Sequence, residues 1–217
     1  MDIVIDIETI PDQSEGAIKR ISKNIKHPAQ MKKQETIDDW HNGAGKYAGE
    51  KDKAIQEAYL KTSFNGGYGQ IVCICADFEG EEYSFTTTGD DKGLLKEFWS
   101  CVYDKTVSTY FIAHNAKFDL PFLFHRSIIN NVKPARDFKP HGKHGNSYFC
   151  TMEAWAGFNG RISLDELSNI LGVGSKTEGM SGDQAWPEYQ KGNIQKIAGY
   201  CMDDVRLTKA IYERLKY

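Results

Sequence analysis

Apolar and polar residues alternate along residues 1–10, with one face formed by Ile3, Ile5 and Ile7 and the other by Asp2, Val4, Asp6 and Glu8. A period of two predicts a β-strand with two different faces, and Pro11 ends it. Two acids on the face of Val4 are unusual for a buried strand. We expect them at its C-terminal end, where open α/β sheets carry their sites.

The next segment has a different pattern. Residues 12–64 are polar and poor in strand formers, and isoleucine and alanine recur in them at helical spacing. This pattern predicts two or three helices, broken at His27-Pro28 and His41–Gly45. Asn65-Gly66-Gly67 is a turn signal. We therefore expect a helical insertion, residues 12–69, after the first strand.

The remaining pattern alternates between strands and helices. Further strands are predicted at residues 70–78, 82–87, 107–113 and 148–152. Further helices are predicted from Asp91, around Leu120–Ile129, after the N-cap Ser163, and over Asn193–Leu215. Hairpin strands followed by strands that alternate with helices predict an α/β fold, a mixed sheet covered by helices. We expect one domain, residues 1–217.

Composition adds few constraints. The chain has 217 residues, 40% of them hydrophobic, and no apolar run of a membrane span's length. No signal peptide is visible, and five scattered cysteines fit a reducing compartment, so we expect a cytoplasmic protein. The net charge of −3 gives no sign of the basic surplus that nucleic-acid binders usually show.

Four carboxylates stand out by their context. Asp6 and Glu8 are two apart on one strand face, Asp119 follows the predicted strand 107–113, and Asp204 lies one helical turn after Tyr200. Like charges so close oppose each other's ionisation, and a hard divalent cation such as Mg²⁺ relieves this. Four such groups could converge on two metal ions about 4 Å apart, which activate water at a phosphodiester.

Three motifs, in this order, resemble those of a known family: Asp-Ile-Glu-Thr at 6–9, Asn-x-x-Phe-Asp at 115–119 and Tyr-x-x-x-Asp at 200–204. They are similar to the motifs of the DEDD 3′→5′ exonucleases, which have an RNase H-like fold and include proofreading domains of DNA polymerases. The tyrosine indicates the DEDDy subclass. The other subclass has a histidine five positions before the last aspartate, where this chain has Gly199.

Two segments extend this resemblance to the exonuclease domains of family-B polymerases. One is the run around Tyr200, and the other is Leu164–Leu167 together with Gly172 and Lys176. Two features depart from it. The spacing of the second motif is closer to that of bacterial proofreading subunits, and the insertion is similar to those of stand-alone phage and bacterial relatives.

The resemblance implies a set of catalytic residues. Asp6, Glu8, Asp119 and Asp204 would hold two divalent ions, Mg²⁺ or Mn²⁺, and Tyr200 would orient the attacking water.

It also implies substrate contacts. Main chain near Thr9 and the side chain of Asn115 would meet the 3′-terminal nucleotide. Phe118, Leu164 and Lys176 are further candidate contacts, although Phe118 is also a natural core residue.

The activity implied is 3′→5′ hydrolysis of DNA at single-stranded or frayed ends, releasing nucleoside 5′-monophosphates. Proofreading or DNA repair would suit it, with a polymerase or replication protein as a partner. Two alternatives stay open: the same chemistry on RNA, whose 2′-hydroxyl the motifs do not read, and an idle nucleic-acid-binding or polymerase-docking module.

Other patterns carry weaker hypotheses. Residues 19–33 hold six basic residues and no acid, either a solvated surface or an arm that grips phosphates. Cys73 and Cys75 point the same way on a strand, which favours a pair of small buried residues. His141, His144 and Cys150 outline a zinc site that lacks its fourth ligand.

Overall fold

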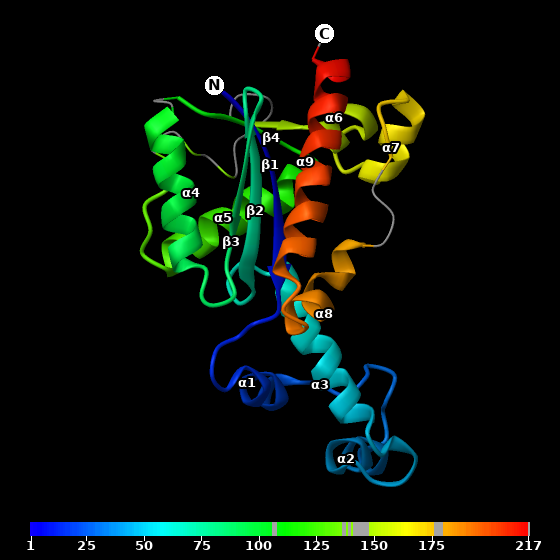
Figure 1. Ribbon diagram of the computed structural model, residues 1–217. Helices are drawn as coiled ribbons and strands as arrows, with labels where there is room; N and C mark the ends of the chain where they lie inside the picture. The colour runs from blue at the N-terminus through cyan, green and yellow to red at the C-terminus, as the bar shows by residue number, and fades with distance from the viewer. Residues whose placement is uncertain (106–107, 136–137, 139, 141–147, 176–179, 217) are drawn as a thin grey trace.

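A five-stranded mixed sheet forms the centre of the molecule, with strand order β3-β2-β1-β4-β5 (Figure 1). The computed structural model describes residues 1–105, 108–135, 138, 140, 148–175 and 180–216. The strands are β1 (Asp2–Ile10), β2 (Gln70–Phe78), β3 (Glu81–Thr86), β4 (Tyr110–Ala113) and β5 (Tyr148–Cys150). β1 pairs antiparallel with β2 and parallel with β4. The central strand therefore joins the antiparallel half of the sheet, β3 and β2, to the parallel half, β4 and β5.

An irregularity in the pairing of β1 with β2 lies beside the predicted acids. Asp6 pairs with Cys75 and Glu8 with Cys73, but Thr9 pairs with Ile71, so Val72 is an extra residue on β2. Such a bulge bends a strand and changes where its side chains point. It places Val72 and Cys73 in the same buried cluster although they are neighbours in sequence.

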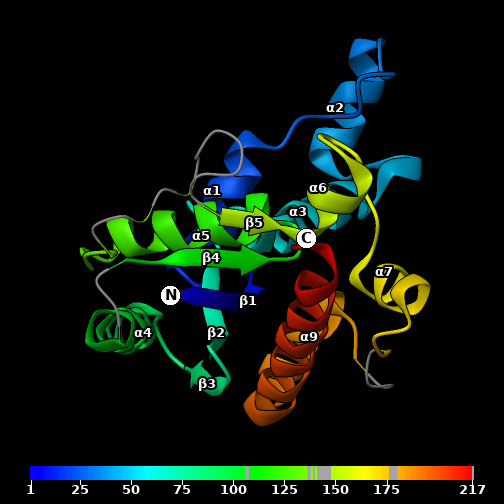
Figure 2. The ribbon, with the colours of Figure 1, turned by 90° about the horizontal axis from the view of Figure 1, so that it is seen from above.

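Helices cover both faces of the sheet. α4 (Lys92–Lys105) and α5 (Ala116–Ile129) lie on one side, and the long α9 (Ile194–Leu215) lies on the other (Figure 2). Ile3, Ile5 and Ile7 of β1 pack with α4 and α5, whereas Val4 and Ile10 pack with α9. The short elements near α9 are α6 (Thr151–Ala156), α7 (Leu164–Leu171), η3 (Gly182–Gln184) and α8 (Ala185–Gln190). The acids of β1, in phase with Val4, therefore face α9.

The expected helical insertion leaves the sheet at the end of β1 (Figure 1). It comprises α1 (Ala17–Asn24), α2 (Gln34–Asn42), η1 (Gly45–Tyr47), α3 (Glu50–Leu60) and η2 (Lys61–Phe64). Two hydrogen bonds fix its base: the Asp12 amide donates to Thr62 Oγ1 at 2.9 Å, and Thr9 Oγ1 donates to the Ser63 carbonyl at 2.8 Å. The last residues of the insertion therefore lie beside the C-terminal end of β1.

Several predicted boundaries differ from the structure. The strand expected through residue 152 ends at Cys150, and α6 begins at Thr151. The helix expected around Leu120 begins already at Ala116, after Asn115 in the left-handed region with φ 63°. β4 begins at Tyr110, and the predicted start at residue 107 lies outside the described residues. α8 and η3 were not predicted.

In the part of the chain that the structure describes, every helix is too short or too polar to cross a lipid bilayer.

Candidate active site

Asp6 and Glu8 extend from the face of β1 that α9 covers. Glu8 is 7% exposed and Asp6 is half-buried. Their cross-strand partners on β2 are the buried thiols Cys75 and Cys73, which offer no opposite charge. The two carboxylates therefore lie at the edge of an apolar layer.

Asp119 reaches the same strand from the first turn of α5. It is 3% exposed, and backbone hydrogen bonds from Ile7 and from its own amide favour its charged form. Ile7 lies between Asp6 and Glu8 on β1. The early start of α5 after Asn115 is thus what brings the third carboxylate to the strand.

Tyr200 and Asp204 lie one turn apart on α9, and both are buried. Between them in sequence, Cys201 donates a hydrogen bond from Sγ to the Asp6 carbonyl at 3.3 Å. This contact fixes the middle of α9 against β1, and it places Asp204 on the helix that covers the two strand acids.

The other three predicted carboxylates all act electrostatically on Asp6. Burial raises the pKa of Asp6 well above its usual value, and the charges of Asp119, Glu8 and Asp204 raise it further. Burial likewise raises the pKa of Asp119 to about 8, and Asp204 adds to the shift. Groups on β1, α5 and α9 therefore act on each other's ionisation.

A pocket of about 460 Å³ opens beside these acids. Asp6 and Asp204 line it together with two of the predicted substrate contacts, Asn115 and Leu164. Asn115 is exposed. Leu164, the first residue of α7, is 6% exposed and belongs to the hydrophobic cluster between α7 and α9. Two of the four predicted acids, Asp6 and Asp204, thus meet these two residues at one opening.

Thr9 and Phe118 do not line this pocket but lie against the end of the insertion. Thr9 bonds to Ser63, and the Phe118 ring lies 6.5 Å from the ring of Phe64, centroid to centroid. Phe118 is partly buried and packs against the core, as the core interpretation predicts. Phe64 is 69% exposed.

Some predicted residues cannot be placed. Lys176, His141 and His144 lie outside the described residues, so the structure does not test the phosphate contact or the zinc site.

Sequence reasoning missed Phe64 and Arg161, which lines the pocket. Phe64 ends the short helix η2 and Arg161 lies in an irregular segment, and neither belongs to a periodic sequence pattern. The available signal for Phe64 was an aromatic residue directly before the Asn65-Gly66-Gly67 turn, and for Arg161 it was a basic residue just ahead of a helix N-cap.

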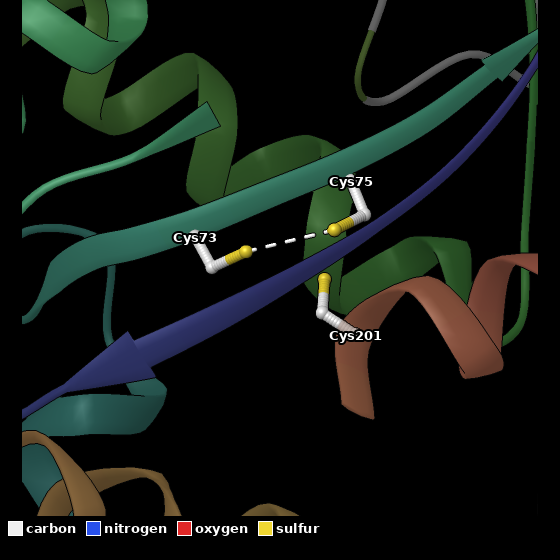
Figure 3. Close-up of side chains that lie close together, drawn as sticks. All are labelled: Cys73, Cys75 and Cys201. Carbon is white, nitrogen blue, oxygen red and sulfur yellow. Dashed lines mark hydrogen bonds between the residues drawn. The ribbon is translucent and has the colours of Figure 1, made fainter. Parts of the chain in front are cut away.

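Three thiols gather next to the carboxylates: Cys73 and Cys75 from β2 and Cys201 from α9 (Figure 3). Cys73 and Cys75 have their sulfurs 3.6 Å apart. Among the described residues, this is the only group of three potential metal ligands with all donor atoms within 4.8 Å. All three are fully buried in the apolar layer between β2 and α9. They pack there as small apolar side chains, as predicted for Cys73 and Cys75.

Comparison with solved structures supports the fold. The family B DNA polymerase from the hyperthermophilic archaeon Pyrobaculum calidifontis matches with a TM-score of 0.60 and 15% sequence identity. The match covers 99% of this chain but only 24% of that polymerase. The mixed sheet and its flanking helices are those of an RNase H-like fold. No curated protein sequence matches the chain.

A protein-family sequence model matches residues 68–217 and describes a "Predicted 3'-5' exonuclease related to the exonuclease domain of PolB". This range includes Asp119, Tyr200 and Asp204 but begins after β1, the strand that carries Asp6 and Glu8. The match covers more than half of the chain, which therefore belongs to this family of predicted 3′–5′ exonucleases related to the exonuclease domain of PolB.

Proposed function

We propose that this chain is a single-domain, two-metal 3′→5′ exonuclease of the DEDDy subclass. In this proposal it removes nucleotides from single-stranded or frayed 3′ ends of DNA. The observation that carries the proposal is that Asp6 lies within the electrostatic reach of Asp119, Glu8 and Asp204, so that burial and these three charges all raise its pKa. Buried acids that oppose each other's ionisation are costly for a fold unless cations bind there.

The donor set fits divalent cations of the Mg²⁺ type. All four groups are carboxylates, the hard oxygen ligands that such ions prefer. They come from three elements, β1, α5 and α9. Asp6, Glu8, Asp119 and Asp204 would hold the two ions. When bound, the ions would supply an activated water and charge stabilisation at the phosphate.

The remaining residues orient the reactants. The Tyr200 hydroxyl would hydrogen-bond the attacking water. The 3′-terminal nucleotide would be contacted by Asn115, by Phe118 and by the main chain near Thr9. Phe64, exposed beside Phe118, suits an additional contact with a base. The water oxygen joins phosphorus, and the bond from phosphorus to the O3′ of the preceding nucleotide breaks. The products are a nucleoside 5′-monophosphate and a strand with a new 3′-hydroxyl.

Replacement of the acids tests the proposal directly. Asp6→Ala and Asp204→Ala should each abolish Mg²⁺-dependent shortening of 5′-labelled single-stranded DNA, because each removes an ion ligand. Asp203→Ala is the matched control, since Asp203 is adjacent in sequence but pairs with Arg206 at 3.0 Å. Retained digestion by either acid variant would refute the proposed site.

Tyr200→Phe tests the proposed role of the phenol. We expect kcat to fall by about tenfold to a hundredfold, on the scale of removing one orienting hydrogen bond, with Mn²⁺ binding unchanged. Tyr212→Phe is the control, because Tyr212 lies on the same helix, α9, but its hydroxyl donates a hydrogen bond to Asp2 of β1 at 2.9 Å. Unchanged kcat in Tyr200→Phe would remove the tyrosine from the mechanism.

The same substrates separate the two alternatives. Equal digestion of labelled RNA would favour an exoribonuclease, because the site would then not discriminate the 2′-hydroxyl. Binding of DNA without Mn²⁺ binding or digestion would favour an idle docking module. We propose DNA as the substrate and a polymerase or replication protein as the partner.

A further inference from the structure

Arg161 shares the pocket with the catalytic candidates Asp6 and Asp204. Its side chain is exposed, and no described carboxylate lies within ion-pair distance of its guanidinium. Several other arginines are engaged: Arg126 bonds Asp91, Arg206 bonds Glu82, and Arg20 bonds Asp12. A guanidinium that pairs with none of the described acids, yet lies beside a cluster of them, therefore needs an explanation.

The segment that carries Arg161 is held firmly at both ends. On its N-terminal side, a Cβ on Gly160 would overlap the carbonyl of Ala156, so the backbone there lies directly on the end of α6. On its C-terminal side, Ser163 caps α7 by accepting from the Glu166 amide at 3.1 Å. Arg161 thus projects from a short, fixed connection between α6 and α7.

His114 adds a third support. Its ring nitrogens lie 2.9 Å from Thr151 Oγ1 and 3.0 Å from the Ile162 carbonyl. A carbonyl only accepts, so the nitrogen facing Ile162 carries the proton. His114 follows β4 directly, so it ties the residue next to Arg161 to the central sheet. It acts as a positioning residue for this segment.

We propose that Arg161 binds a backbone phosphate of the nucleic-acid strand that enters this pocket. The guanidinium is planar and presents a fork of donors that matches phosphate oxygens. A strand that approaches four carboxylates also needs positive charge from the protein. This inference rests on the proposed function, since it names how that site holds its substrate.

Binding experiments test Arg161 apart from the chemistry. Fluorescence anisotropy would follow labelled oligothymidylate in EDTA, where metal-dependent hydrolysis is stopped, over a series of KCl concentrations. Arg161→Ala should weaken binding about tenfold, the size of one charge-assisted hydrogen bond. It should also reduce the salt slope of log K by about 0.7, as expected when the protein neutralises one phosphate fewer on a single strand.

Two further variants make the result specific. Arg161→Lys keeps the charge and should keep the salt slope. Arg214→Ala removes an exposed arginine at the far end of α9, outside the pocket, and should leave both quantities unchanged. The inference is overturned if Arg161→Ala matches the wild type, if its affinity falls with an unchanged salt slope, or if Arg214→Ala has the same effect.

Failure of the proposed function has a different signature. A wild-type protein that binds the strand through Arg161 but releases no nucleotides with Mg²⁺ would refute the exonuclease and keep the phosphate contact. Repeating the series with oligouridylate shows whether the contact serves DNA, RNA or both.

Discussion

Asp119 gives the site a stability signature at the scale of one residue. Its pKa is about 8 in the fold and 3.8 in the unfolded chain. Between these values the folded state holds a proton that the unfolded state has released, so stability falls as pH rises. Without divalent ions, we expect the free energy of unfolding to fall by on the order of 3 kcal/mol from pH 5 to 8.

Asp119→Asn, which cannot ionise, should reduce this pH dependence without abolishing it, because the pKa of Asp6 is also raised. Urea denaturation at several pH values measures the change. Asp203→Asn should behave like the wild type. Parallel curves for the wild type and Asp119→Asn would show that another group causes the fall. Mg²⁺ should stabilise the wild type more at pH 8 than at pH 5, because protons compete with the ion for the same carboxylates.

The sequence was most informative about residues whose spacing follows from secondary structure. Asp6 and Glu8 lie two apart on a strand, and Tyr200 and Asp204 four apart on a helix, so each pair could be placed on one face before any fold was known. Arg161 lies in an irregular connection. Its position depends on contacts of its two neighbours: Ile162 with His114, which is distant in sequence, and Gly160 with the end of α6.

At the scale of elements, α4, α5 and β2 meet at a buried ion pair. Arg126 of α5 donates two hydrogen bonds to Asp91, at 2.7 and 3.0 Å, and Asp91 also accepts from the Ile71 amide at 3.1 Å. Removing one partner leaves the other charge buried, so Arg126→Ala should destabilise the fold by about 3–5 kcal/mol.

Thermal or chemical unfolding measures this cost. The matched control is Glu82→Ala, which breaks the exposed bidentate pair with Arg206 and should cost less than about 1 kcal/mol. Equal destabilisation in the two variants would mean that burial does not set the strength of these pairs.

Boundaries between elements were harder to predict because tertiary contacts decide them. Tyr148–Met152 has a strand-like composition, yet only Tyr148–Cys150 pairs with β4 before α6 begins. Local sequence also gave no sign of the bulge at Val72, because it arises from the pairing of β1 with β2.

At the scale of the whole molecule, the order of the elements predicted the mixed sheet, since a hairpin followed by strand–helix alternation has few compact arrangements. The net charge was a misleading indicator of nucleic-acid binding. The value of −3 includes the four site acids, and two divalent ions would change it to −3 + 4 = +1. The distribution of charge matters more than its sum.

The insertion carries the most uneven part of that distribution. Of the six basic residues between 19 and 33, Arg20 bonds Asp12 and lies over the Tyr68 ring, so it stabilises the base of the insertion. The other five are exposed: Lys19, Lys23, Lys26, Lys32 and Lys33. They belong to the part of the molecule that extends beyond the end of β1, where the strand acids lie (Figure 1).

We expect these five lysines to hold the strand outside the active site by its phosphates. Changing all five to glutamate, with Arg20 kept, should weaken single-strand binding and reduce its salt slope by about 0.7 for each phosphate that is no longer neutralised. Lys92→Glu with Lys96→Glu on α4 is the control, because these exposed lysines lie on the opposite face of the sheet from α9. Hydrolysis of a substrate too short to reach the insertion should be unaffected, since the carboxylates are unchanged. An unaltered salt slope would make the five lysines a solvated surface.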